Sequence, residues 1–152
     1  MQCPPYTEGL LPGLEECPCI QGYYRSKDDS KGEMCSRPPS SPRNLTVTKA
    51  HSTTATLSWN PPLDEGNRTD TRYKVFCNTC GSLVVFNPGD ETFQQTSVTI
   101  KNLYPETSYQ FHVFSLNGVS GLVEEEPRYA EILAVTAENK PVLSSRVEEL
   151  EL

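Results

Sequence analysis

The sequence has no long hydrophobic run, little basic charge and only two histidines, and each shortage excludes a class of protein. Its longest aliphatic or aromatic run is 83–86, whereas a helix needs about 20 apolar residues to cross a bilayer. Thirteen basic against 20 acidic residues give a net charge of −7, so no basic surface is available for a nucleic acid. The first residues lack the basic and apolar regions of a signal peptide. We therefore expect no membrane span, no nucleic-acid partner and, if the chain is extracellular, a longer parent protein.

Cysteine, by contrast, is concentrated at one end. Four of the six cysteines, Cys3, Cys17, Cys19 and Cys35, fall in the first 35 residues. This segment has too few apolar side chains to hold a fold, so it needs disulfides or a metal ion. A Cys17–Cys19 bridge would be strained. We expect Cys3–Cys17 and Cys19–Cys35 instead, each closing a loop of about 15 residues and worth roughly 3 kcal/mol. A four-thiolate zinc site is the alternative, but the spacing lacks the paired short intervals typical of zinc.

The rest of the chain alternates strand patterns with turns. We expect a cysteine-rich, disulfide-bonded module at 1–36, a stiff proline-rich joint at 37–42, a β domain at 43–137, and an acidic tail or the start of a linker at 138–152. Alternating apolar side chains predict strands with one buried face. The pattern predicts a mostly-β fold, a seven-stranded antiparallel sandwich, with strands at 45–48, 55–59, 73–77, 83–86, 97–100, 109–113 and 130–134.

Two features narrow the class of sandwich. Trp59 ends the second predicted strand, where it can fill the space between two sheets, and Leu103–Tyr109 has the pattern Leu-x-Pro-x-Thr-x-Tyr of a tyrosine corner. Cys77 and Cys80 are too close in sequence to bridge two sheets. A core tryptophan without an inter-sheet disulfide resembles fibronectin type III rather than an antibody-type domain. The candidate core residues are Trp59, Tyr73, Leu103, Tyr109 and Phe111.

Longer stretches resemble one receptor family. Cys17–Arg25, Cys35 and the prolines after it are similar to the stalk of the Eph (ephrin-receptor) tyrosine kinases. Leu57–Pro62 and Tyr73–Cys80 are similar to that family's first fibronectin repeat, and the resemblance spans residues 3–137. One departure is clear: the family usually has two more cysteines soon after Cys80, where this chain continues with Gly81. The resemblance implies the end of a cysteine-rich, EGF-like region at residues 1–36, followed by the first fibronectin repeat.

The resemblance also implies a role. It is that of a non-catalytic extracellular spacer and receptor-clustering module of a single-pass plasma-membrane protein, with protein partners and weak self-association. The family binds ephrin through a domain that these residues do not contain. Leu10, Leu11 and Leu14 lie between two cysteines of the first module and are candidates for a small apolar self-association patch. The alternative is an EGF-like and fibronectin pair from another adhesion or matrix protein.

We do not expect an enzyme, and we expect neither a bound metal ion nor a cofactor. His51 and His112 both have the pattern of solvated surface side chains, so no nucleophile–base pair is indicated. Cys77-Asn-Thr-Cys80 has redox spacing, but it ends a strand rather than starting a helix. A local structural disulfide is favoured over a bridge elsewhere or redox activity. Asp64, Glu65 and Asp70 do not match a calcium loop, which favours a solvated loop.

Two Asn-x-Thr sequons fit an extracellular protein. The sequon of Asn44 runs into the first predicted strand, and that of Asn67 lies in a turn. We expect both to be candidates for glycosylation, with Asn67 the stronger because a turn exposes it.

Overall fold

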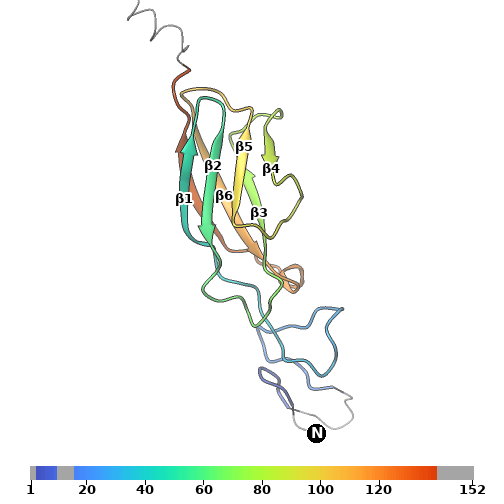
Figure 1. Cartoon of the computed structure of the whole chain (residues 1–152). Coiled ribbons are helices and arrows are strands. Elements are labelled where there is room, and N and C mark those ends of the chain that lie inside the picture. Colours follow the sequence, from blue (N-terminus) through green and yellow to red (C-terminus); the bar gives the residue numbers. More distant parts are fainter. Residues whose placement is uncertain (1–2, 10–15, 140–152) are drawn as a thin grey trace, which may run out of the picture.

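The computed structural model describes residues 3–9 and 16–139, which form an elongated chain with a β-sandwich at one end and a loop-rich module at the other (Figure 1). Two sheets make the sandwich, in the orders β1-β2-β5-β4 and β3-β6-β7, with antiparallel pairing throughout. This confirms the expected mostly-β class. The described elements are β1 (Arg43–Ala50), β2 (Ala55–Asn60), β3 (Arg72–Cys77), β4 (Val85–Asn87), β5 (Ser97–Lys101), β6 (Ser108–Leu116), the 3₁₀ turn η1 (Ser120–Leu122) and β7 (Tyr129–Val135).

The core lies between the two sheets because the inward-facing side chains of each strand are apolar. In β2 every second residue is buried, and in β6 the odd-numbered residues 109–115 are buried. Trp59 is edge-on to Tyr73 with ring centroids 5.4 Å apart, and its ring is 6.0 Å from that of Phe93. All five candidate core residues are buried in this cluster: Trp59, Tyr73, Leu103, Tyr109 and Phe111.

The tyrosine corner has the geometry expected of it. The backbone N–H of Tyr104 donates to the Tyr109 hydroxyl at 2.8 Å. Leu103, directly before, is buried beneath the same turn. The hydroxyl thus satisfies a backbone donor that the turn from β5 to β6 would otherwise leave without a partner.

One predicted strand begins later than expected. The sequence indicated 83–86, but β4 covers Val85–Asn87, because pairing with β5 starts at Val85 opposite Lys101. Just before it, the Val84 N–H donates to the Gly81 carbonyl, so this part of the run belongs to a turn. Leu83 is exposed and Val84 packs on the core. Apolar composition alone did not distinguish the turn from the strand.

The loop-rich end is held by covalent bridges. Cys3 is bonded to Cys17 and Cys19 to Cys35, the same pairs that loop geometry favours. Short backbone bridges join Thr7 to Cys19 and Tyr24 to Ser36. We call residues 3–9 and 16–36 the disulfide module. The leucines proposed for self-association, Leu10, Leu11 and Leu14, and most of the predicted tail at 138–152 lie outside the described residues.

Candidate functional site at the junction

The disulfide module is fastened to the sandwich by one arginine. Arg68 belongs to the loop between β2 and β3, and its guanidinium reaches across to Asp29, with Nη1 to Oδ2 at 2.7 Å and Nη2 to Oδ1 at 3.2 Å. Nη1 also donates to the Ser36 hydroxyl at 3.0 Å. On its own side, Arg68 donates to Asp70 through Nε and Nη2 at 3.0–3.2 Å. We call these four residues the Arg68 clamp.

The Arg68 clamp is largely shielded from water. The side chains of Arg68 and Asp29 are only 13% and 10% exposed, and Asp70 is more open. The hydrogen bond from Arg68 is the main cause that lowers the pKa of Asp29. Burial is the largest single influence on the pKa of Asp70 and raises it, but the hydrogen bonds and charge of Arg68, together with backbone hydrogen bonds, bring the net direction down. The two carboxylates in turn raise the pKa of Arg68, so all three groups are charged at neutral pH.

A second set of bonds ties the joint itself to the sandwich. The Arg37 N–H donates to the Gly66 carbonyl at 3.1 Å, and the Asn117 side-chain amide donates to the Arg37 carbonyl at 2.8 Å. The Arg37 guanidinium pairs with Asp64, and a hydrogen bond from the Gly66 N–H is the main cause that lowers the pKa of that carboxyl. Gly66 is required here: its φ is +74°, and a β-carbon would overlap the Arg37 carbonyl. The backbone of the joint and the backbone of the sandwich are therefore in direct contact.

The proline-rich joint is packed rather than free. Pro39 is fully buried, and the Ser40 N–H donates to the Asp64 carbonyl at 2.8 Å. The Asp64 N–H in return donates to the Ser40 hydroxyl at 3.1 Å. Because proline already fixes φ and these bonds fix the neighbours, the joint holds one conformation.

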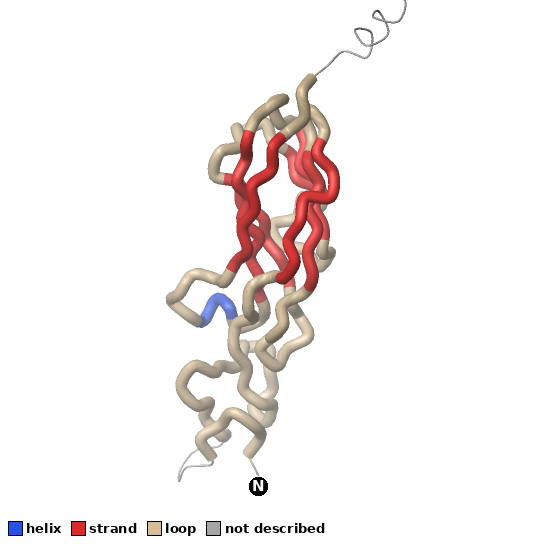
Figure 2. Tube along the Cα trace, turned by 90° about the vertical axis from the view of Figure 1, so that its left-hand side faces the viewer, coloured by secondary structure: helices blue, strands red, loops and turns tan. Residues whose placement is uncertain are grey.

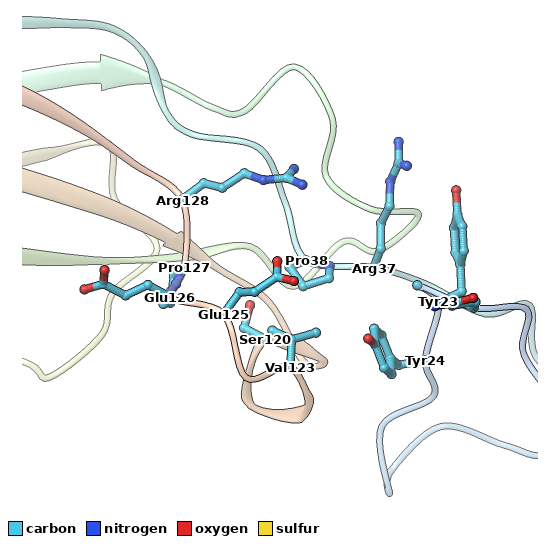
Figure 3. A pocket seen from close by; sticks show the side chains of 12 residues that line it. Tyr23, Tyr24, Arg37, Pro38, Ser120, Val123, Glu125, Glu126, Pro127 and Arg128 are labelled. Atoms are coloured by element: carbon cyan, nitrogen blue, oxygen red, sulfur yellow. The ribbon is translucent and has the colours of Figure 1, made fainter.

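Beside the joint lies a groove of about 310 Å³ between the two parts (Figure 3). Tyr23 and Tyr24 approach it from the disulfide module, and the segment before β7 approaches from the sandwich with Glu125 and Arg128. The Arg37 guanidinium lies 5.5 Å from the centre of the Tyr23 ring. The groove therefore follows the seam between the disulfide module and the sandwich.

The structure places the remaining sequence-predicted residues as follows. Cys77 and Cys80 are bonded to each other at the end of β3. Asn44 and Asn67 are both exposed. His51 is exposed, but His112 is not the solvated side chain we expected. It points outward from β6, yet it is half-covered, bonded through Nε2 to Glu131 at 3.0 Å and stacked on Tyr129.

The acidic loop is partly solvated, as expected, with the side chains of Asp64 and Asp70 36% and 44% exposed. Each of the two also pairs with an arginine, Arg37 and Arg68 respectively, which the sequence did not indicate. Sequence reasoning missed the Arg68 clamp because Arg68 and Asp29 are 39 positions apart and no periodic pattern links them. Across the described residues, no group of three or more His, Cys, Asp or Glu side chains could hold a metal ion. Nor does that part of the chain include a helix long and apolar enough to cross a membrane.

Comparison with known proteins agrees with this architecture. The model of the family "Fibronectin type III domain" matches residues 40–131. The chain belongs to the fibronectin type III family. Two solved structures share the fold: the fibronectin type-III domain of human fibronectin type III domain containing protein 3 (24% identity, TM-score 0.51, covering 70% of this chain and 93% of that one) and the "forth FNIII domain of human" (22%, TM-score 0.53, covering 77% and 98%).

The similarity to receptors extends beyond the sandwich. The chain is 31% identical to Ephrin type-A receptor 4-B of Xenopus laevis over 99% of its length, 36% identical to Ephrin type-A receptor 8 of Mus musculus over 89%, and 37% identical to Ephrin type-B receptor 4a of Danio rerio over 94%. It spans only 14–16% of the length of these relatives. The resemblance to the ephrin-receptor ectodomain is thereby confirmed, and it includes the disulfide module.

Proposed function

We propose that this fibronectin type III chain is a non-catalytic stalk segment of an ephrin-receptor-like ectodomain, which holds the domains on either side of it at a fixed spacing. The observation that carries the proposal is the Arg68 clamp. A flexible linker would let the two modules rotate independently, whereas a shielded ion pair with backbone bonds beside it restricts them to one arrangement. The described chain also enters at the disulfide module and leaves at the far end of the sandwich (Figure 2), as a spacer requires.

The finer parts of this role are also proposals. We assign 1–36 to the EGF-like module, 37–42 to the joint and 43–137 to the fibronectin domain, with 138–152 as a tail or linker. The parent protein is a single-pass plasma-membrane receptor whose partners are proteins, and the segment supports receptor clustering by weak self-association. Ephrin binding and kinase activity belong to other parts of such a receptor. The similarity over 89–99% of the chain favours this function over an unrelated adhesion or matrix protein.

Two exposed asparagines support an extracellular location. Asn44 and Asn67 both have positive φ and exposed side chains, so a glycan could be attached without displacing any packed group. Mass spectrometry of the chain secreted from mammalian cells, before and after glycosidase treatment, tests this. Modification at Asn67 would support the proposal, and complete absence of glycan at both asparagines would count against it.

The spacer role is tested in a chimeric receptor. The corresponding segment of an ephrin receptor is replaced by this chain, either unchanged or with Arg68→Gln. We expect equal surface expression and ephrin affinity, but weaker ligand-induced autophosphorylation when the clamp is removed, because a loose stalk no longer fixes the spacing between neighbours. Equal autophosphorylation in the two chimeras would refute a rigid spacer.

A further inference from the structure

The outward face of the sheet β3-β6-β7 carries exposed apolar side chains, whereas a sheet face in contact with water is usually polar. Phe76, Tyr129, Leu133 and Val135 are 42–62% exposed, and strand register places them on one surface with Phe114. In one row Phe114 stands between Lys74 and Tyr129, and in the next His112 stands between Phe76 and Glu131. We call this surface the aromatic face.

The other sheet of the same sandwich provides an internal comparison. Its outward residues on β2 and β5 are polar, most of them hydroxyl-bearing, and the Thr56 and Thr99 hydroxyls are bonded to each other across the strands at 3.1 Å; on the short edge strand β4 the outward Val85 is exposed. Apart from Val85, this is the usual composition of a sheet face in water. Both sheets have the same core to cover, so the fold does not require the apolar character of the aromatic face. Exposed apolar side chains gathered on one face in this way are typical of interaction sites.

The aromatic face is already ordered. The Tyr129 ring stacks on His112 at 4.6 Å between centroids and lies 5.1 Å from that of Phe114. The Phe76 ring is 6.1 Å from His112 on the other side, and Glu131 fixes the His112 ring through Nε2. Side chains that are held in place before binding lose little conformational entropy when a partner covers them.

Shape and charge on the aromatic face are self-complementary. A hollow of about 570 Å³ lies over β3 and β6. Lys74, Phe76 and Phe114 border it together with Glu91 and Glu126 from the neighbouring loops, while Tyr129 stands beside it on β7. If a second copy is turned about a twofold axis parallel to the strands, its β7 lies over this copy's β3. Tyr129 of each copy then meets the hollow of the other. Lys74 of each copy comes within one residue pair of Glu131 of the other.

We propose that the aromatic face is a contact between two copies of this chain. The strands run along the long axis of the molecule (Figure 1), so the twofold axis places both disulfide modules at the same end, as for two receptors side by side in one membrane. The nine residues of β6 and three strands give a face of roughly 400 Å² per copy, at about 3.4 Å per residue and about 4.8 Å per strand. That is about half the area of a standard stable interface, so the contact is weak and becomes significant where receptors are concentrated.

The test uses the 152-residue chain with its disulfides formed. Its weight-average mass is measured by sedimentation equilibrium from micromolar to millimolar concentration. We expect a rise toward the dimer, with concentration-dependent amide NMR shifts on β3, β6 and β7 and none on β1, β2 and β5. The variant Leu133→Lys should stay monomeric over the whole range. The matched control, Leu63→Lys, replaces a leucine that is 81% exposed and lies away from the aromatic face, and should behave as the native chain.

Charge reversal tests the orientation. Lys74→Glu and Glu131→Lys should each weaken self-association several-fold, and the double variant should recover most of it, because the two residues lie one residue pair apart across the twofold axis. The proposal would be overturned if association changed the amide NMR shifts of β1, β2 or β5, or if the Leu133→Lys variant still associated. The proposal would also be overturned if the native chain stayed monomeric over the whole concentration range, even if it bound a different protein through the aromatic face. The inference deepens the clustering role proposed above. Its failure leaves the spacer role standing, because the receptor chimera tests that through Arg68 alone.

Discussion

Replacing Arg68 by glutamine should open the junction without unfolding either module. The structure gives the size of the effect. Asp29 would lose both hydrogen bonds from the forked guanidinium and keep only the Ser26 N–H at 2.7 Å among its close hydrogen bonds. Removing one partner of a shielded ion pair costs about 3 kcal/mol, and the more exposed Asp70 adds less than about 1 kcal/mol. Since about 1.4 kcal/mol corresponds to a factor of ten, the open junction becomes about a hundredfold more populated.

Hydrogen exchange at one amide measures this opening directly. The Arg37 N–H is bonded to the Gly66 carbonyl, so it exchanges only when the joint leaves the sandwich. We expect its protection to fall about a hundredfold in Arg68→Gln, while the amides of core residues such as Leu57 and Val113 stay as protected as before. Asp29→Asn should have a similar effect, and the double variant should be no worse than Arg68→Gln alone, because the two act through one interaction. Unchanged Arg37 protection in either single variant would refute this account of the junction.

Three further outcomes follow from the same structure. Trp59→Ala removes a buried indole from the core and should destabilise the sandwich by about 3–5 kcal/mol; an unchanged melting temperature would show that the packing described is wrong. Gly66→Ala should open the junction, because its β-carbon would overlap backbone, whereas Gly32→Ala, in open space, should leave Arg37 protection intact. The lowered pKa of Asp29 means that the Arg68 clamp is fully stabilising above the ordinary aspartate pKa of about 3.9 and is lost as pH falls through the lowered value. Arg37 protection, corrected for intrinsic exchange, should therefore drop below about pH 4 in the native chain, and it should drop less in Arg68→Gln, where only Asp64, whose pKa is also lowered, still stabilises the joint.

Local pattern made the sandwich predictable. Alternation places Leu57 and Phe111 inward whatever the rest of the chain does, and the Leu-x-Pro-x-Thr-x-Tyr spacing fixes the turn around Tyr109. The prediction placed the strand β4 less accurately, because an apolar run of four residues does not show where its hydrogen bonding to the neighbouring strand begins. Val84 is apolar because it covers the core from a turn, which composition cannot distinguish from a strand position.

The candidate site could not be predicted in the same way. Arg68, Asp29 and Asn117 come from three separate loops, and each looks like an ordinary solvated residue in its own segment. Only the close approach of the two modules, permitted by the positive φ of Gly66, brings them together. His112 shows the same limit. Its outward direction follows from strand period, but its partners Glu131 and Tyr129 follow from register, which alternation does not specify.

Residual dipolar couplings of the native chain test the central claim most directly. Amide couplings from the disulfide module and from the sandwich are measured in one aligning medium, and an alignment tensor is fitted to each set separately. A stalk segment that acts as a rigid spacer predicts two tensors that agree in magnitude and orientation. Tensors of different magnitude, with the smaller one in the disulfide module, would show that the two parts move independently and would contradict the account.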